Sequence, residues 1–358
     1  MTWQFHSCSQ FAAHVGTWDA LQRASTDTPF FESAFLGPLL EVFGQGNEIL
    51  ALHHGRDGLD AATLLKPLGG GRWQLFQPSQ LPLGPWLCAS ADGLESRLRS
   101  LIRAMPGFVL TLGAPQLDPR LVARPLSSDS LRTQDYIRTS YLDVAGTFDA
   151  YWEARGKNLR QNTRKQRNKL QAEGTPTQLE CVTEPADVAS AIADFGALES
   201  AGWKAGGGTA IAADNDQGRF YRTMLENFCA QGRGRIYRYR FAEKVVAMDL
   251  CIDNGPLVVV LKTAYDESYR QVSPSTLMRQ DQFSAWWAEG RYRRIEFYGK
   301  TLEWHTRWTD AERALYHATL YRWAWLGRLM ARRSAQRQAA VSPATEAAPA
   351  ENVPDEAR

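Results

Sequence analysis

Cysteine is scarce in this sequence, and no two of its cysteines lie close together in the chain. Zinc sites and dithiol redox motifs require cysteines separated by only a few residues. Because that spacing is absent, we expect no metal site and no redox motif, and the simplest inference is a reducing compartment. The five cysteines are Cys8, Cys88, Cys181, Cys229 and Cys251.

Long apolar runs are absent as well. The N-terminus, which contains Trp3, Phe5 and His6, lacks the basic stretch followed by an apolar run that marks a signal peptide. No stretch approaches membrane-spanning length, so we predict no transmembrane segment. We therefore expect a cytoplasmic protein, which could still be peripheral to the inner membrane through a membrane-bound partner.

Neither sign of charge dominates the composition. The 41 basic and 39 acidic residues leave a formal net charge of +2, which excludes a global field that would attract polyanions. A nucleic-acid partner is therefore not expected. With 44% hydrophobic and 22% charged residues the chain has the composition of an ordinary globular protein, and its 358 residues favour two domains.

The first part of the chain alternates helical and strand-like segments, which predicts an α/β fold. A boundary at 144–148 would close a first unit, residues 1–145. We expect two helices within 10–43, a third at 92–104, and strands at 48–54, 61–66, 72–76, 108–112, 121–126 and 136–142.

A second series follows, which predicts another α/β unit over residues 146–333. We expect helices at 149–171, 186–201, 216–231, 274–289 and 310–332, and strands at 178–182, 235–241, 245–252, 257–264 and 294–298. The last segment, 334–358, contains eight alanines, three prolines and no aromatic residue. This composition predicts a disordered tail.

Several stretches of the second unit resemble a known family. They are 152–170, 199–211 and 261–275, together with 295–299 and Trp308. They resemble the CelD/BcsL-like GNAT acetyltransferases, which are associated with cellulose and exopolysaccharide production and related to the FemAB-like double-GNAT fold. Weaker similarity extends the resemblance to about 1–332.

This resemblance implies two tandem GNAT-like units, each a mixed, mostly antiparallel sheet flanked by helices. The first unit would be non-catalytic, because it contains no comparable coenzyme loop. The second would use acetyl-CoA or another acyl-CoA as co-substrate, with no metal. The acceptor would be an amine or hydroxyl on a sugar or polysaccharide precursor, and exopolysaccharide assembly proteins are the implied partners.

The strand at 257–264 and the helix after Pro274 have the layout of a coenzyme A site. In a GNAT fold the free N–H groups at such a helix N-terminus bind the pyrophosphate. The family loop has Gln or Arg, two residues, Gly, one residue, then Gly or Ala, and here serines replace both glycines, which leaves less room for a phosphate. An ordinary capped helix is the alternative. The expected coenzyme-binding residues are Lys262, Arg270, Gln271, Val272, Ser273, Ser275 and Thr276.

Acyl transfer also needs a base and a group that assists the leaving thiolate. Our catalytic candidates are Glu199, Asp249, Tyr298 and His305. Glu199 could face a substrate cavity or lie on the surface. Asp249, in an apolar strand, could be a base or the partner of a cation such as Lys262. His305 could titrate near neutrality and transfer protons, or be structural.

A basic run at 155–169 contains seven cations and no acidic residue, and several of its cations share one helical face. That face could contact the 3′-phosphate of coenzyme A, an anionic glycan, a nucleotide-linked sugar or an anionic membrane. The alternative is a solvated helix whose charges pair with acidic neighbours. The expected substrate-binding residues are Trp203, Lys204, Tyr265, Asp266, Arg160 and Arg164.

Two other functions compete with acyl-CoA transfer. One is a FemAB-like transferase that uses aminoacyl-tRNA, although the chain shows no heptad hairpin of the kind such proteins carry. The other is a non-catalytic adaptor of exopolysaccharide assembly, which the serines at positions 273 and 275 favour somewhat.

Overall fold

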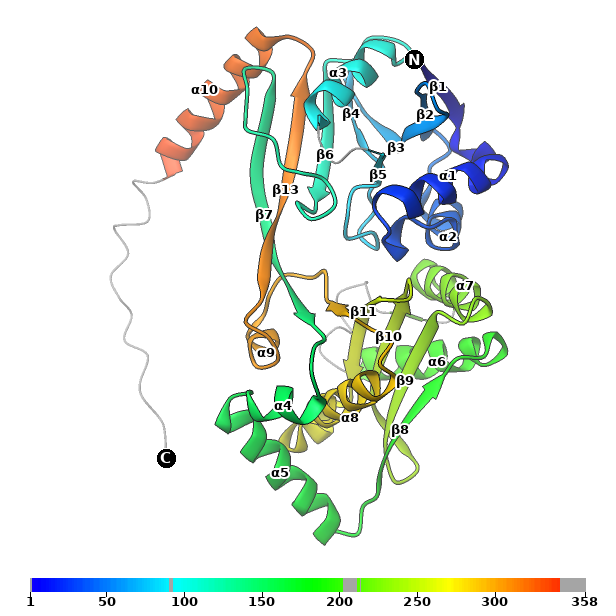
Figure 1. Ribbon diagram of the computed structural model, residues 1–358, viewed down its shortest axis with the longest axis vertical. Coiled ribbons are helices and arrows are strands. Elements are labelled where there is room, and N and C mark those ends of the chain that lie inside the picture. The colour runs from blue at the N-terminus through cyan, green and yellow to red at the C-terminus, as the bar shows by residue number, and fades with distance from the viewer. Residues whose placement is uncertain (1, 90–92, 202–210, 213, 342–358) are drawn as a thin grey trace.

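The computed structural model describes residues 2–89, 93–201, 211–212 and 214–341. Its described strands form one mixed sheet that runs through both halves of the chain, with helices on both faces (Figure 1). The strand order is β1-β2-β3-β4-β6-β13-β7-β12-β11-β10-β9-β8, and β5 pairs with β3. The predicted α/β fold class is confirmed.

The first half contributes the strands that lie at one end of this sheet. Its elements are β1 (Thr2–Ser7), α1 (Phe11–Ser25), α2 (Ser33–Phe43), β2 (Ile49–His54), β3 (Leu59–Gly69), β4 (Arg72–Leu75), β5 (Trp86–Cys88), α3 (Leu94–Ala104), β6 (Thr111–Leu117) and β7 (Leu131–Asp143). The strand expected at 121–126 does not form, and the sequence analysis missed β1 and β5.

The second half builds the other end of the sheet. Its elements are α4 (Phe148–Glu153), α5 (Lys157–Ala172), β8 (Thr177–Val182), α6 (Pro185–Ala201), α7 (Asp216–Ala230), β9 (Gly234–Phe241), β10 (Lys244–Asp253), β11 (Leu257–Tyr265), α8 (Pro274–Glu289), β12 (Arg294–Glu296), α9 (Glu303–Thr306), β13 (Glu312–Tyr321) and α10 (Ala324–Val341). A 3₁₀ helix, Glu267–Val272, joins β11 to α8.

The prediction of a single helix at 310–332 is wrong. Residues 312–321 form β13, which lies antiparallel between β6 and β7 and so returns from the second half to the first (Figure 1). Tyr316, Ala318 and Leu320 are buried at alternate positions, which is the period of a strand with one covered face. Only the segment from Ala324 onwards is helical.

The two halves share one hydrophobic core. The inner faces of α1 and α2 pack against β2 and β3, and the same cluster continues through α6 and α7 onto β10 and β11. At the junction the ring of Phe35 on α2 meets that of Phe220 on α7 edge to face, with centroids 5.3 Å apart. On the opposite face α3 covers the first half, while α8 covers the second half.

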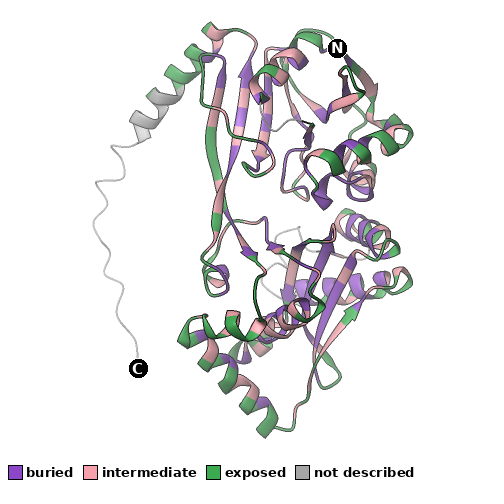
Figure 2. Cartoon of the chain, viewed as in Figure 1, coloured by how far each residue is buried: buried purple, intermediate pink, exposed green. Residues whose placement is uncertain are grey.

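Strands β9 and β10 are mostly buried, whereas two helices are mostly exposed (Figure 2). They are α5, the basic helix of the sequence analysis, and α10. Because α10 extends to Val341, residues 334–341 of the expected disordered tail are helical, and 342–358 lie outside the described residues. None of the described helices has the length and apolar character needed to cross a bilayer.

Candidate functional site

Strands β11 and β12 pair over a short distance and then separate. Residues Leu257–Val259 lie parallel to Arg294–Glu296, but β11 continues to Tyr265 after β12 has ended. On its other edge β11 has a bulge against β10. Lys262 pairs with Leu250 and Val260 with Cys251, so Leu261 is an extra residue without a cross-strand partner. The bulge therefore lies at the point where the sheet opens.

A cavity of about 630 Å³ occupies this opening. It is bounded by the end of β11, the first turns of α8 and the segment from Phe297 to Trp308. Its described lining contains no Asp or Glu, which makes it suited to an anionic ligand. Its cationic residues are Lys262, Arg270, Arg279, Lys300 and Arg307.

Only two of these cations lack a carboxylate partner. Lys262 pairs with Glu199, Arg279 with Asp249 and Arg307 with Glu303. Arg270 and Lys300 are exposed and make no ion pair with any described residue. Their charge is therefore available to a ligand at the mouth of the cavity.

The N-terminus of α8 opens onto the same cavity. Ser273 precedes it in the left-handed region, with φ +47°, and its carbonyl accepts the N–H of Thr276 at 2.9 Å. Most amides of the preceding loop also donate within the protein, including those of Asp266, Tyr269 and Ser273. The N–H of Ser275 has no partner among the described residues.

The loop therefore does not present the row of free amides that the family pattern implied. What remains for a diphosphate is one open N–H, the hydroxyl-bearing side chains of Ser275 and Thr276, and the charges of Arg270 and Lys300. This set fits an anionic group bound mainly through side chains, supported by the positive end of the α8 dipole.

A second cavity, of about 670 Å³, adjoins the first and shares Ser273, Thr276 and Arg307 with it. Its wall is formed by the first turns of α5, including Asn158 and Asn162. The side-chain amide of Gln166 on α5 donates to Ser273 Oγ at 3.2 Å. Helix α5 therefore extends the polar surface beside the N-terminus of α8.

Glu199 and Lys262 meet on the opposite face of the opening, where α6 packs on β11. The Lys262 ammonium donates to the Glu199 carboxylate at 3.1 Å, and the N–H of Ile211 donates to the same carboxylate at 2.8 Å. Lys262 also lies over the ring of Tyr221, 5.3 Å from its centroid. Glu199 is 4% exposed, so it holds Lys262 in place and does not itself face open solvent.

Asp249 pairs with a residue that the sequence analysis did not consider. The carboxylate is fully buried and accepts hydrogen bonds from the guanidinium of Arg279 at 3.1 Å and from the hydroxyl of Thr263 at 2.5 Å. The suggested partner, Lys262, pairs with Glu199 instead. Asp249 therefore anchors Arg279, whose guanidinium lies 4.4 Å from the centre of the Trp304 ring in the cavity wall.

His305 lines the cavity, but the expectation that it titrates near neutrality is wrong. Burial, reinforced by the charge of Arg279, lowers the pKa of His305 to about 4. Its Nδ1 accepts the N–H of Leu302 at 2.9 Å, so the neutral ring carries its proton on Nε2. His305 is thus a hydrogen-bond donor at neutral pH and has no free basic nitrogen.

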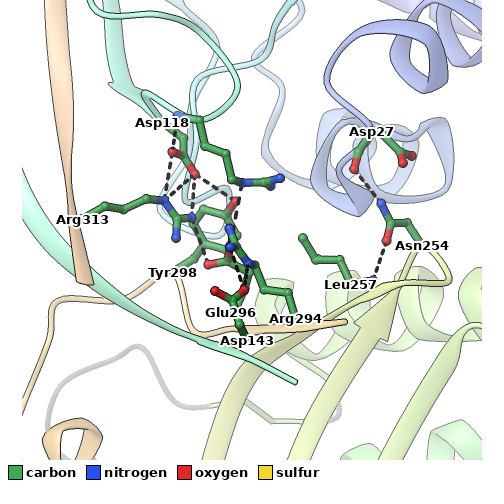
Figure 3. A network of polar contacts seen from close by, with 10 residues as sticks. Asp27, Asp118, Asp143, Asn254, Leu257, Arg294, Glu296, Tyr298 and Arg313 are labelled. Carbon is green, nitrogen blue, oxygen red and sulfur yellow. Dashed lines mark hydrogen bonds and ion pairs between the residues drawn. The ribbon is translucent and has the colours of Figure 1, made fainter. Parts of the chain in front are cut away.

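Tyr298 lies outside the cavity, in a buried polar network between the two halves (Figure 3). Its hydroxyl donates to Asp118 at 3.1 Å, and Arg313 on β13 donates to both Asp118, at 2.6 Å, and Glu296, at 2.9 Å. Burial raises the pKa of Tyr298 and raises that of Glu296 to about 7. The network joins the halves, and nothing in its position gives Tyr298 access to a ligand in the cavity.

The remaining expected coenzyme residues divide into two groups. Lys262, Arg270, Ser273, Ser275 and Thr276 line the cavity. Gln271 is exposed outside the cavity lining, and Val272 is buried in the core beneath α8.

The expected substrate residues are scattered. Tyr265 lines the cavity, whereas Asp266 caps the 3₁₀ helix and pairs with Lys244 at 2.8 Å. On α5, Arg160 pairs with Glu153, and Arg164 is exposed without an ion pair to a described residue. Trp203 and Lys204 lie outside the described residues.

Sequence reasoning missed several residues of the cavity wall. Arg279 follows Ser275 by four residues, so helical periodicity places both on the face that meets β11. Lys300, Trp304 and Arg307 come from the segment after β12, whose described helix, α9, has four residues and is too short to give a periodic signal. In the part of the chain that the structure describes, no three His, Cys, Asp or Glu side chains form a group able to hold a metal ion.

Comparisons with known proteins identify the same region. Residues 157–306 match the family described as the acetyltransferase (GNAT) domain, Acetyltransf_6. None of the curated protein sequences compared with the chain is significantly similar to it.

Solved structures share the fold over almost the whole chain. The C-terminal domain of a protein described as a lysylphosphatidylglycerol synthetase, from Agrobacterium fabrum, is 12% identical, with a TM-score of 0.54 over 90% of this chain and 96% of that one. The crystal structure of FemX is 10% identical, with a TM-score of 0.55 over 86% and 96%. This chain therefore contains a GNAT-type acetyltransferase domain and is an acyltransferase.

Proposed function

We propose that the protein transfers an acyl group, in the first place acetyl, from acyl-CoA to an amine or hydroxyl of a sugar or polysaccharide-precursor acceptor in a ternary complex. One observation carries the proposal. The sheet opens between β11 and β12 into a cavity with unpaired cations and the N-terminus of α8 at its mouth. The acceptor attacks the thioester carbonyl carbon of acyl-CoA and the C–S bond breaks. The proton that the acceptor loses is balanced by protonation of the thiolate, which leaves as the thiol of coenzyme A.

The residues around the opening would have separate roles in binding the coenzyme and in the transfer step. Arg270, Lys300 and the N–H of Ser275 would hold the diphosphate at the cavity mouth. The backbone at Leu261, the extra residue of the bulge, would lie beside the thioester carbonyl as it gains negative charge, and Lys262, oriented by Glu199, would add a cation there. His305 would donate its Nε2 proton as a hydrogen bond to the departing sulfur.

The acceptor would approach from the side of α6 and Lys262, opposite α8. A sugar acceptor rests on the sequence resemblance, because the Trp304 ring in the cavity wall already stacks on His305 and lies against Arg279. The association with exopolysaccharide or cellulose production rests on the sequence resemblance alone, and assembly proteins of that pathway remain the proposed partners. The five cysteines are free thiols, which fits the proposed cytoplasmic location.

The direct test is isothermal titration with acetyl-CoA. The double variant Arg270→Ala/Lys300→Ala should weaken binding at least about tenfold, because two charge-assisted contacts to phosphate are lost. The matched control is Arg164→Ala/Lys165→Ala on α5, which removes the same charge from an exposed helix and should leave the affinity unchanged. Equal affinity in both variants would place the coenzyme elsewhere.

The fold similarity to FemX favours a second candidate, the FemAB-like transferase that uses aminoacyl-tRNA. The exposed cations of α5 and the polar cavity beside them suit a longer polyanionic donor. In that case Arg164→Ala/Lys165→Ala should weaken aminoacyl-tRNA binding, and acetyl-CoA should not bind at all. Binding of neither donor would favour the third alternative, a non-catalytic adaptor of exopolysaccharide assembly.

A further inference from the structure

Exposed apolar side chains are concentrated at one end of the first half. Ten large hydrophobic side chains are exposed among the described residues, and five of them gather here around the start of α10. We call this group the aromatic end. It consists of Phe108, Trp323, Trp325, Leu329 and Met330, and the most exposed are Phe108 at 62% and Trp325 at 56%.

The rings of the aromatic end lie against one another and not in the core. Trp323 and Trp325 stack with centroids 5.8 Å apart, and Phe108, just before β6, lies 5.9 Å from Trp323. Each ring thus belongs to one continuous apolar surface. A single exposed hydrophobic residue would need no explanation, but a contiguous aromatic group marks an interaction surface.

The described contacts of helix α10 with the rest of the chain lie in its first turns. A side chain at Gly327 would place its Cβ 2.1 Å from the carbonyl oxygen of Asp129, so the helix touches the loop before β7 there. Arg328 pairs with Asp129 at 2.9 Å. Beyond this point residues 328–333 are all exposed, and the helix projects away from the molecule (Figures 1 and 2).

The charges carried by α10 and the residues just before it are all positive, and Asp129 of the neighbouring loop pairs with one of them, Arg328. Residues 322–341 contain five arginines and no acidic residue. The guanidinium of Arg322 lies 5.9 Å from the ring centre of Phe108, and Arg332 and Arg333 are exposed without an ion pair to a described residue. Aromatic rings interleaved with arginine are the side chains that anchor proteins at the headgroup level of a bilayer.

We propose that the aromatic end, with the arginines of α10, docks the protein on the surface of an anionic lipid bilayer. Trp323, Trp325 and Phe108 enter the interfacial layer, while Arg332 and Arg333 contact lipid phosphates. A two-fold interface between copies of this chain would instead bring the arginine-rich helices of both copies together, which like-charge repulsion opposes. The protein lies on the membrane and does not span it, and this inference is independent of the proposed acyl transfer.

The test is co-sedimentation of the full chain with vesicles. Vesicles of phosphatidylcholine with about one third phosphatidylglycerol should bind the protein, and pure phosphatidylcholine vesicles should bind it far more weakly. Raising the salt concentration should release it, since surface attraction falls off within a Debye length. Equal binding to both vesicle types, or to neither, would overturn the proposal.

Two variants and one control identify the surface. Trp323→Ser/Trp325→Ser should lower vesicle binding at least about tenfold, because two interfacial rings are removed. Arg332→Gln/Arg333→Gln should lower it about 25-fold, at roughly fivefold for each charge. The control Arg164→Gln/Lys165→Gln changes the same charge on α5 and should bind as the parent does. If the control loses binding and the α10 variants keep it, α5 is the membrane face and the proposal is wrong.

Light scattering after gel filtration tests whether a second copy of the chain covers the aromatic end instead of a membrane. The molar mass of the parent should be no larger than that of Trp323→Ser/Trp325→Ser at the same concentration. A dimer that Trp323→Ser/Trp325→Ser dissociates would assign the aromatic end to a second copy of the chain. The melting temperature and the far-ultraviolet circular dichroism of the same variants should match those of the parent, as expected if they remain folded.

Discussion

The ammonium of Lys262 on β11 lies 3.1 Å from the carboxylate of Glu199 on α6, at the point where the sheet opens between β11 and β12. The two residues are 63 positions apart in the sequence. Glu199 was a candidate base and Lys262 a candidate coenzyme ligand, and their contact makes the two side chains depend on each other. The Glu199 carboxylate already accepts hydrogen bonds from Lys262 and from the N–H of Ile211.

We expect this pair to act together in turnover. Lys262→Met and Glu199→Gln should each lower kcat/KM about 100-fold, because each removes or misplaces a cation beside the developing oxyanion. The double variant should be little worse than either single one, since the second change removes a contact that is already lost. Steady-state kinetics of the parent, the two single variants and the double variant give the coupling free energy between Lys262 and Glu199.

The competing role for Glu199 predicts a different pattern. If Glu199 is the base, its effect and that of Lys262 are additive, and only Glu199→Gln removes an inflection from the dependence of kcat/KM on pH. That pattern would contradict the positioning role.

Charge at the start of α8 should control coenzyme binding. Ser275→Glu places a carboxylate beside the only described N–H at the helix mouth that lacks a partner, so it should weaken acetyl-CoA binding at least about tenfold through repulsion of the diphosphate. Gln271→Glu adds the same charge on an exposed side chain outside the cavity lining and serves as the control. Isothermal titration compares them, and unchanged affinity in Ser275→Glu would relocate the site.

His305 should stay neutral throughout the physiological range. Its pKa is lowered from 6.5 to about 4, mainly by burial, so the stability that it contributes is present above pH 6.5 and is lost as the pH falls through 4. Proton NMR titration of the ring should show no midpoint between pH 6 and 8. A midpoint in that range would contradict the buried donor.

Two substitutions of His305 test the roles of its two ring nitrogens separately. Asn can replace Nδ1 as the acceptor for the Leu302 N–H but loses the Nε2 donor, whereas Gln can retain a donor near the Nε2 position. His305→Asn should therefore fold and lose activity, and His305→Gln should keep more of it. Equal activity in both variants would show that the Nε2 proton has no role.

The junction network should make stability depend on pH through Glu296. Burial raises the pKa of Glu296 from 4.5 to about 7, so its folded state binds a proton that the unfolded chain has already released. Its contribution to stability is complete below pH 4.5 and is lost as the pH rises through 7. Across that interval the free energy of unfolding of the parent should fall by about 3 kcal/mol relative to Glu296→Gln.

Urea unfolding at several pH values measures this difference. Glu303→Gln, an exposed change on α9, is the control for carboxylates in contact with water. Parallel curves for the parent and Glu296→Gln would show that the buried carboxyl does not take up a proton on folding.

The shared core predicts that the two halves unfold together. Phe35→Ala leaves a cavity between α2 and α7 and should cost about 3–5 kcal/mol. A single transition, shifted to lower temperature, is expected for the variant by calorimetry and by near-ultraviolet circular dichroism. Two separate transitions would show that the halves are independent domains.

Local sequence signals located most of the second half. The helix beginning at Pro274 and the strands over 235–241, 245–252 and 257–264 follow from apolar periodicity and turn residues, and the structure contains them at nearly those bounds. The same signals failed at 310–332, because a strand that lies between two other strands and a helix of similar apolar content look alike over so short a stretch.

The sequence by itself determined an α/β protein in which a polar loop leads into a helix beginning at Pro274, because those features depend on neighbouring residues. Only the tertiary structure decided which charged and polar side chains pair with one another. Asp249 could have paired with any nearby cation, and register together with the packing of α8 gave it Arg279. Tyr298 lay in a plausible site segment, yet the return of β13 buried it against Asp118. Such partners lie far apart in the chain, so their choice depends on strand order and packing, which no local pattern encodes.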